Sequence, residues 1–434
     1  MSAALRRHAS RHTCIAVAFV LASALIHIIV ASPPGAHARW SLALGLVLTA
    51  LMLGAWALGQ SASARSHRWT LWAGVAARLV VAPVDVSANH DVQRYLWDGA
   101  VVGAGFDPYR LPPASPELAE LRRTWPTPNE HETYPTLYPP GALLLFRAAT
   151  LLGRGSAPAV WKIFVLLASV AMLFVTAAAL RALSLERHLA LVALSPLLLL
   201  ETAIGAHVDI FAALGVASAL YLLASQRMWM VGIALGAGAL VKFLPVFALL
   251  PIAVHFQKHR GARAVAAAGA VGALGYGLAM SVGLRPLGSL GVFFAKWRFG
   301  SPVFAALESA FGDVNALRLA PLLALGVLVF VAWRAQRDWK APAFLALAAT
   351  LWFSPVVFPW YLVPMLPLMA AAPSGFALGW VTSLPLTLEV YDRWETTGVW
   401  QPGAWPLWAI AMSWVLGAAF DFRLIGSSRA VQPR

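Results

Sequence analysis

The segment HDVQRYLWDGAVVGAGFDPYR, residues 90–110, holds side chains that could perform acid–base chemistry. It contains three Asp, two Arg and a His, although only 12% of the whole chain is charged. No residue from 89 to 102 breaks a helix. In a helix Asp91, Tyr95 and Asp98 share one face, because they are four and three residues apart. The pattern therefore predicts a short helix with two acids on one side.

The spacing of the two acids favours a general base over a metal site. Asp91 and Asp98 would lie roughly 10 Å apart along the helix, which is too far for both to ligate one ion. A single carboxylate facing a dry cavity is suited to proton abstraction, because desolvation raises its pKa toward the working pH. Arg94 would oppose that shift and could bind a phosphate instead. The alternative is a solvated external helix whose acids and arginines form ion pairs.

Composition places the chain in a membrane. It is 60% hydrophobic, whereas soluble domains are about 45–50% apolar and about 25% charged. The formal charge of +14 is spread over short loops between apolar runs, as membrane topology requires, so nucleic-acid binding is not expected. The single Cys14 excludes an intramolecular disulfide and a Cys-rich metal site. We expect one all-α polytopic domain over residues 1–434, with about 12–15 transmembrane helices.

The candidate helices are apolar runs of spanning or near-spanning length. They lie at about 13–32, 40–58, 69–84, 158–180, 189–203, 207–225, 229–241, 243–256, 262–283, 317–334, 341–355, 357–373, 375–391 and 403–420. The first is interpreted as a retained helix rather than a signal peptide, since it is long enough to span and no cleavage site stands apart from it.

Charge placement predicts the orientation. If the N-terminus is cytoplasmic, the basic loops near residues 65–68, 181–187, 227, 258–260 and 334–340 also fall on that side. This agreement requires that residues 138–153 do not cross the membrane, so they are interpreted as an outer-leaflet or re-entrant helix. Residues 85–157 then form a long external loop with short juxtamembrane helices, and residues 284–315 form a second one. The site is therefore expected on the outer face of a bacterial-type inner membrane.

Ionisable residues inside or beside other apolar segments point to the same face. Glu201, His207 and Asp209 occur in ETAIGAHVDIF, Lys242 stands just before a helix-breaking proline, and Arg78 lies in the outward half of the third run. Each could simply extend toward the interface. Together they favour a binding site, because ionisable groups in membrane segments are costly.

Aromatic residues add two further candidates. The run SPVVFPWYLVPMLP, residues 354–367, predicts an interrupted helix, and irregular backbone at membrane depth is tolerated where it lines a cavity or is buried. Its Trp360 and Tyr361 could line that cavity or belong to an interfacial belt. In the second external loop, Lys296 and Arg298 stand among aromatics, which suits a lipid phosphate and its tail or plain anchoring at the headgroups.

The ordered set of motifs resembles the GT-C glycosyltransferases, and most closely the mannosyltransferase-like branch around glycosyltransferase family 87. The similar features are HDVQRYLWDGAVVGAGFDPYRLPP, NEHETYPTLYPPGALLLF, GAHVD at 205–209, Lys-x-x-Pro at 242–245 and Pro-Trp-Tyr at 359–361. Phe106 and Asp107 depart from the family's pattern before Pro-Tyr, and His90 departs from it before the first acid.

The resemblance implies a sugar transfer from a polyprenyl-phosphate donor to an acceptor hydroxyl. Asp91 matches the family's acidic base, and Asp98 matches the acid of the Trp-Asp-Gly element. The basic residues Arg94 and Lys242 match positions suited to the donor phosphate. The predicted donor- and acceptor-binding set consists of Arg78, Arg94, Tyr95, Tyr109, Glu201, His207, Asp209, Lys242, Trp360 and Tyr361.

The sugar is expected to be a hexose, with mannose favoured, and the acceptor a glycan or a lipid. No cofactor is required, although a divalent cation could assist the phosphate. The other expected partners are membrane lipids. The alternative function is a transporter or flippase of a lipid-linked saccharide, which would also place ionisable residues in a cavity but commonly carries internal repeats.

Overall fold

Helices make up the whole framework of the protein. The computed structural model describes residues 3–125, 127, 132–256, 258–286, 288 and 290–430. Within these residues there is no strand, and one isolated bridge joins Phe299 to Val356. The predicted all-α fold is confirmed.

The elements fall into three successive groups. The first contains α1 (Ala3–Ser23), α2 (Leu25–Val30), α3 (His37–Gly59), α4 (Ala64–Val81), α5 (His90–Gly103), η1 (Pro116–Leu118), α6 (Ala119–Thr124) and α7 (Pro140–Thr150). The second contains α8 (Ala157–Ala182), η3 (Glu186–His188), α9 (Ala190–Ala193), α10 (Pro196–Ala203), α11 (Asp209–Ala224), α12 (Met228–Ala239), η4 (Leu244–Ala248) and α13 (Leu249–His255). The third contains α14 (Lys258–Ser281), α15 (Leu290–Lys296), α16 (Pro302–Phe311), α17 (Asp313–Ala335), α18 (Lys340–Trp352), η5 (Pro359–Met365), α19 (Leu366–Ala371), α20 (Gly375–Ser383), η6 (Leu384–Glu389), α21 (Val390–Thr397) and α22 (Trp405–Ala430).

Several helices have the length and composition of membrane spans. In the described part of the chain, five are long and apolar enough to cross a bilayer, and six shorter apolar helices accompany them. The five are Arg11–Val30, His37–Gly59, Ala157–Ala182, His259–Ser281 and Asp313–Ala335. The protein is therefore a multi-pass membrane protein, while the number of crossings stays a prediction. Helix α7 has 11 residues, and at about 17 Å it is too short to span, which supports the interpretation of residues 138–153 as a non-crossing helix.

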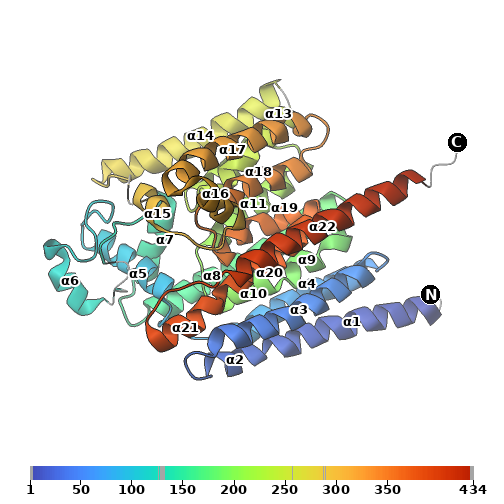
Figure 1. Ribbon diagram of the computed structural model, residues 1–434, viewed down its shortest axis with the longest axis horizontal. Coiled ribbons are helices and arrows are strands. Elements are labelled where there is room, and N and C mark those ends of the chain that lie inside the picture. Colours follow the sequence, from blue (N-terminus) through green and yellow to red (C-terminus); the bar gives the residue numbers. More distant parts are fainter. Residues whose placement is uncertain are drawn as a thin grey trace.

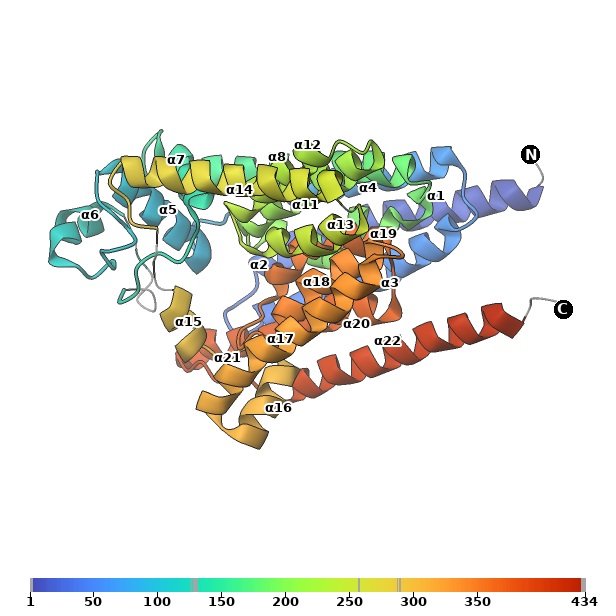
Figure 2. The ribbon, with the colours of Figure 1, turned by 90° about the horizontal axis from the view of Figure 1, so that it is seen from above.

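The two ends of the bundle differ in what they carry. Both termini of the described chain lie at one end, whereas α5, α6, α7, α15 and α21 gather at the opposite end in both views (Figures 1 and 2). The two segments predicted as external loops, 85–157 and 284–315, contribute α5 to α7 and α15 to that end. The end remote from the termini is therefore where a site can be assembled from segments far apart in the sequence.

Some apolar runs predicted as single helices are divided, and this is a correction to the sequence analysis. The run 189–203 becomes α9 and α10, separated by Leu194 and Ser195, and Pro196 begins α10. The run 375–391 becomes α20, η6 and the start of α21, with Pro385 near the first break. Proline lacks the N–H that an α-helix needs, which explains both breaks. The interrupted helix predicted for residues 354–367 is present as η5 followed by α19.

Candidate active site

Helix α5 begins at the residues that the sequence analysis singled out. Asn89 caps it, since its Oδ1 accepts a hydrogen bond of 3.1 Å from the Val92 N–H. Asp91 in the first turn interacts favourably with the helix dipole. The helix packs closely on α7, because a Cβ at Gly99 would overlap the Phe146 carbonyl. These contacts fix the acidic end of α5 at a cavity.

The cavity encloses about 610 Å³, within the range of small-molecule sites. Residues of α2, α3, α5, α10, α15, η5, η6 and α21 line it, together with the turns before η4 and α11. Asp91, Glu201, His207 and Lys242 are among its walls. The polar groups of four separate segments therefore converge on one space.

His207 links two carboxylates at the cavity. Its Nδ1 lies 3.3 Å from Asp91 Oδ2, and its Nε2 lies 3.1 Å from Glu201 Oε2. The Tyr95 hydroxyl lies 3.5 Å from the same Nδ1. The Trp360 ring stacks on the imidazole at a centroid distance of 3.9 Å. The ring is thus held on both nitrogens and on one face.

The charge on His207 follows from these neighbours. Burial disfavours a charged imidazole, but the hydrogen bonds and charges of Asp91 and Glu201 outweigh it and raise the pKa of His207 to about 9. A cationic His207 keeps a positive charge beside Asp91, whose side chain is 25% exposed, while that of His207 is only 5% exposed. Asp91 is therefore an accessible carboxylate paired with a buried cation.

The turn that carries His207 has a backbone that only certain residues allow. A Cβ at Gly205 would overlap the His207 ring, so any larger residue here would displace that ring. The next residue, Ala206, has φ of +46°, and its carbonyl accepts a hydrogen bond of 2.9 Å from Trp161 Nε1. Lys162 Nζ also donates to the Ala203 carbonyl. Helix α8 therefore holds the turn between α10 and α11 in place.

Lys242 supplies a second cation to the cavity lining. Its Nζ lies 3.0 Å from Asp209 Oδ1 and 4.2 Å above the centre of the Tyr361 ring. Asp209 is buried, whereas the Lys242 side chain keeps 19% of its surface exposed. An ammonium group has three N–H donors, so Lys242 can bind Asp209 and still donate to an anion in the cavity.

Comparison with known families assigns the chain. A family model described as alpha-(1->6)-mannopyranosyltransferase, N-terminal domain, matches residues 9–258, which is more than half of the chain. The chain belongs to this family. Comparison with curated proteins and with solved structures gave no match. The predicted resemblance to GT-C mannosyltransferases is confirmed, and the protein is a membrane glycosyltransferase.

Asp98 and Arg94 of this mannosyltransferase form a buried pair rather than a solvated one. Arg94 Nε donates to both Asp98 oxygens at 3.1 and 3.2 Å, and Thr136 donates to Asp98 Oδ2 at 2.6 Å. Desolvation raises the pKa of Asp98 in spite of these partners. Arg94 lines the cavity and Asp98 does not. Asp98 is therefore placed to orient Arg94, not to touch a ligand.

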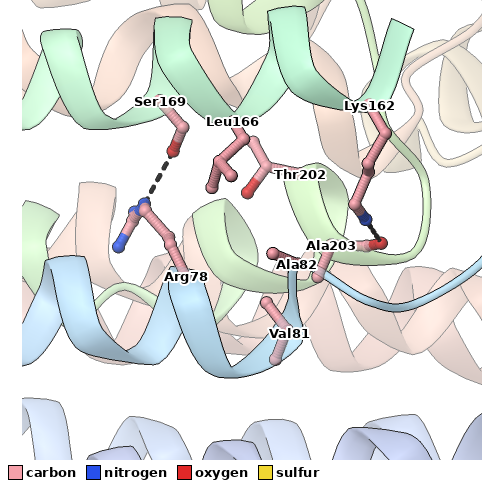
Figure 3. Close-up of a pocket in the computed structure, with 8 residues that line it drawn as sticks. All are labelled: Arg78, Val81, Ala82, Lys162, Leu166, Ser169, Thr202 and Ala203. Carbon is pink, nitrogen blue, oxygen red and sulfur yellow. Dashed lines mark hydrogen bonds between the residues drawn. The ribbon is translucent and has the colours of Figure 1, made fainter. Parts of the chain in front are cut away.

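Besides Asp98, four predicted residues lie outside the cavity lining. Tyr95 and Asp209 contact the lining residues His207 and Lys242, respectively, and the other two are Arg78 and Tyr109. Arg78 is buried between α4 and α8, where its Nε donates to Ser169 Oγ at 2.6 Å (Figure 3) and its Nη1 donates to the Gly74 and Ala193 carbonyls. The Tyr109 hydroxyl donates at 2.8 Å to the carbonyl of Tyr138, which does line the cavity. Neither Arg78 nor Tyr109 reaches the cavity directly, so their binding roles stay predictions. Their contacts fit residues that position neighbouring elements.

The sequence analysis missed one wall of the cavity. Tyr391, Trp394 and Glu395 of α21 line it, as does Trp400 just beyond that helix. This segment contains three charged residues within eight, which resembles an ordinary surface turn. Its density of Trp and Tyr among those charges was the available signal.

A metal site was left open by the sequence analysis. Within the residues that the structure describes, no group of three or more His, Cys, Asp or Glu side chains could hold a metal ion. Arg298 of the second predicted loop contacts Glu308 and Asp313, while Lys296 lies 5.7 Å from the centre of the Tyr134 ring. The basic residues of the predicted set that line the cavity are Arg94, Lys242 and His207.

Proposed function

We propose that this protein transfers mannose from a polyprenyl-phosphate donor to an acceptor hydroxyl on the outer face of the membrane, with Asp91 as the general base. The observation that carries the proposal is the position of Asp91. It is a partly exposed carboxylate of the cavity in a mannosyltransferase-family protein, and its neighbour His207 is held by Glu201 from the other side. Membership of the family supports the sugar and the class of reaction.

The chemistry is a single displacement at the anomeric carbon. Asp91 accepts the proton of the acceptor hydroxyl, and the acceptor oxygen forms a bond to C1 while the bond from C1 to the phosphate oxygen breaks. The phosphate leaves with the electron pair. One displacement inverts C1, so an α-linked product, as in the family's name, requires a β-linked donor.

The cations of the cavity suit the leaving group. Lys242 and Arg94 both line the cavity, and each is held by an acid, Asp209 and Asp98 respectively. Cations fixed before the reaction stabilise the charge that develops on the departing phosphate. The Lys242 ammonium group also lies over the Tyr361 ring, and this cation–π contact helps to hold it at the cavity.

Reconstituted protein tests the proposed donor. The full chain in liposomes would receive polyprenyl phosphate carrying radiolabelled mannose, and the products would be separated and digested with a mannosidase. We expect a new α-mannosidic bond with this donor and none with a nucleotide-linked mannose. Transfer from the nucleotide sugar alone would contradict the proposal, and so would movement of the labelled lipid between leaflets without a new bond.

A further inference from the structure

Aromatic rings form a continuous series of four cavity-lining residues, Phe358, Trp360, Trp394 and Trp400, and the buried Phe299. Phe358 stacks on Trp360 at a centroid distance of 4.5 Å and on Phe299 at 4.5 Å. Phe299 in turn lies 5.6 Å from Trp400, which lies 6.3 Å from Trp394. All five residues lie beyond residue 258, outside the part matched by the family model.

Both ends of this series meet a neighbour of Asp91. At one end, Trp360 stacks on His207, which contacts the Asp91 carboxylate. At the other end, Trp394 lies 5.0 Å from the ring of His90, the residue just before Asp91. The aromatic wall therefore stands beside the carboxylate that takes the acceptor's proton.

Polar groups are interleaved with these rings. Glu395, His37 and Asn89 line the same cavity, and Glu395 accepts hydrogen bonds from the Gly35 N–H at 2.8 Å and from His37 Nδ1 at 3.0 Å. Sugars present apolar C–H faces and hydroxyl groups together, and ring faces with nearby acceptors and donors match both. A hydrocarbon chain could contact the rings but would form no hydrogen bonds with these groups.

Other residues of the cavity lining have a different character. They are Ile29 and Val30 of α2 and Leu200 and Ile204 in or just after α10. These aliphatic side chains suit a hydrocarbon chain better than a sugar, since they offer no hydrogen bonds. The aromatic side is thus the one whose chemistry fits a saccharide.

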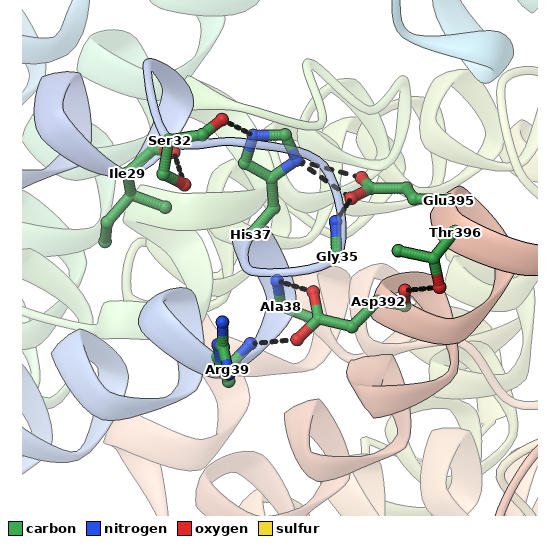
Figure 4. A network of polar contacts seen from close by, with 9 residues as sticks. All are labelled: Ile29, Ser32, Gly35, His37, Ala38, Arg39, Asp392, Glu395 and Thr396. Atoms are coloured by element: carbon green, nitrogen blue, oxygen red, sulfur yellow. Dashed lines mark hydrogen bonds and ion pairs between the residues drawn. The ribbon is translucent and has the colours of Figure 1, made fainter.

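Helix α21 is fixed to the turn between α2 and α3. Asp392 accepts hydrogen bonds from the Ala38 and Arg39 N–H groups at 2.7 and 3.1 Å. Together with the bonds of Glu395 to Gly35 and His37, they form the network in Figure 4. Trp394 lies between these two acids in the sequence, so its position is set by a rigid attachment rather than by a free loop.

We propose that Tyr391, Trp394 and Trp400 form an acceptor subsite that stacks on a saccharide ring whose hydroxyl faces Asp91. The inference rests on the proposed function and assigns three residues beyond the family match to the acceptor side of the cavity. Trp394 is the central residue, because it joins the aromatic series to His90.

Kinetics with a defined acceptor tests the subsite. The probe is an octyl glycoside of an α-linked mannose disaccharide, used with full-length protein in liposomes and the radiolabelled donor. We expect Trp394→Ala to raise the acceptor KM about tenfold, the size of a lost aromatic contact, and to change the donor KM less than twofold. Trp394→Phe should restore part of the loss. The matched control is Trp408→Ala, because Trp408 lies on α22 and is 76% exposed.

Binding without donor separates this inference from the proposed function. Equilibrium dialysis of the same disaccharide requires no transfer, so reduced binding to Trp394→Ala supports the subsite even if the assigned donor is wrong. A wild-type unfolding temperature of Trp394→Ala excludes misfolding as the cause, and partial rescue of binding in Trp394→Phe, itself folded normally, provides a second check. An unchanged acceptor KM and unchanged dialysis would overturn the subsite. A raised donor KM with normal disaccharide binding would overturn it too, and would assign the aromatic side to the prenyl chain.

Discussion

Asp91 and Asp98 come from one helix but have different surroundings. Asp91 reaches the cavity and contacts His207, while Asp98 is enclosed by Arg94 and Thr136. A buried acid with fixed donors can orient a cation, and an accessible acid beside a cation can accept a proton. At the scale of single residues, the proposed base is therefore distinguished by access rather than by residue type.

Lys242 and Asp209 form a pair whose members must be tested together. Lys242→Met alone leaves the buried Asp209 without its partner, which costs about 3–5 kcal/mol, so lost activity could reflect lost stability. Lys242→Met with Asp209→Asn removes both charges. We expect this double variant to keep its thermal unfolding temperature near wild type. Its KM for the polyprenyl-phosphate donor should rise about ten- to a hundredfold, as for one charge-assisted hydrogen bond. An unchanged donor KM would contradict the phosphate role.

His207 predicts a dependence of stability on pH. Its folded pKa of about 9 lies above the unfolded value of about 6.5, so the folded state holds the proton more tightly. The stabilisation is present in full below pH 6.5 and is lost as the pH rises through 9. We expect thermal unfolding of wild type relative to His207→Gln to show a declining difference between pH 6.5 and 9.5. A constant difference over that range would rule out a raised pKa.

At the scale of elements, α21 packs the segment beyond residue 258 against the part of the chain that the family model matches. It belongs to the segment beyond the family match, yet its acids cap the start of α3, which lies inside that match. A carboxylate from another helix thus performs the task of a local N-cap, and Ser or Asp is absent from the position before α3, where Ala36 stands.

Removing this cap should loosen both elements. Asp392→Ala deletes two acceptors for the first turn of α3, and we expect a loss of about 1 kcal/mol in unfolding free energy with a raised acceptor KM. Asp392→Asn keeps one acceptor oxygen, so its unfolding free energy should lie between those of wild type and Asp392→Ala. Thr397→Ala, on the exposed end of α21, is the control. Equal stability of all four proteins would show that the attachment does not matter.

The predictable parts of the site are those encoded locally. Asn89 and the helix that follows it, and Lys242 beside Pro245, could be found in the sequence because caps and breakers act over a few residues. The expectation that these segments meet at one membrane face came from the predicted transmembrane topology. The role of Arg78 could not be resolved, because its partner Ser169 lies 91 residues away. The same holds for Trp394, whose ring neighbour His90 belongs to α5, a distant part of the chain.

At the scale of the whole molecule, the site and the termini lie at opposite ends of the bundle (Figure 2). The predicted orientation places the termini in the cytoplasm and α6 outside. A lipid-linked donor presented at the outer leaflet would then reach the cavity without crossing the bundle, which agrees with the outer-face location in the proposal.

Cysteine labelling tests this orientation. Cys14 is exposed and must first become serine. Glu120 on α6 and Asp338 between α17 and α18 have exposed side chains, at 82% and 53%. In intact cells, a membrane-impermeant maleimide should label Glu120→Cys and should label Asp338→Cys only after permeabilisation. The reverse pattern would place the cavity on the cytoplasmic side.

The most direct test of the central claim is the rate of mannose transfer by Asp91→Asn. The variant keeps the shape and a hydrogen bond to His207 but cannot accept a proton, and a general base contributes about 10²–10⁴-fold. With the labelled donor and the disaccharide acceptor, we predict a single-turnover rate lowered by at least about a hundredfold, with donor binding retained and Asp338→Asn at the wild-type rate. A wild-type rate for Asp91→Asn would contradict the account.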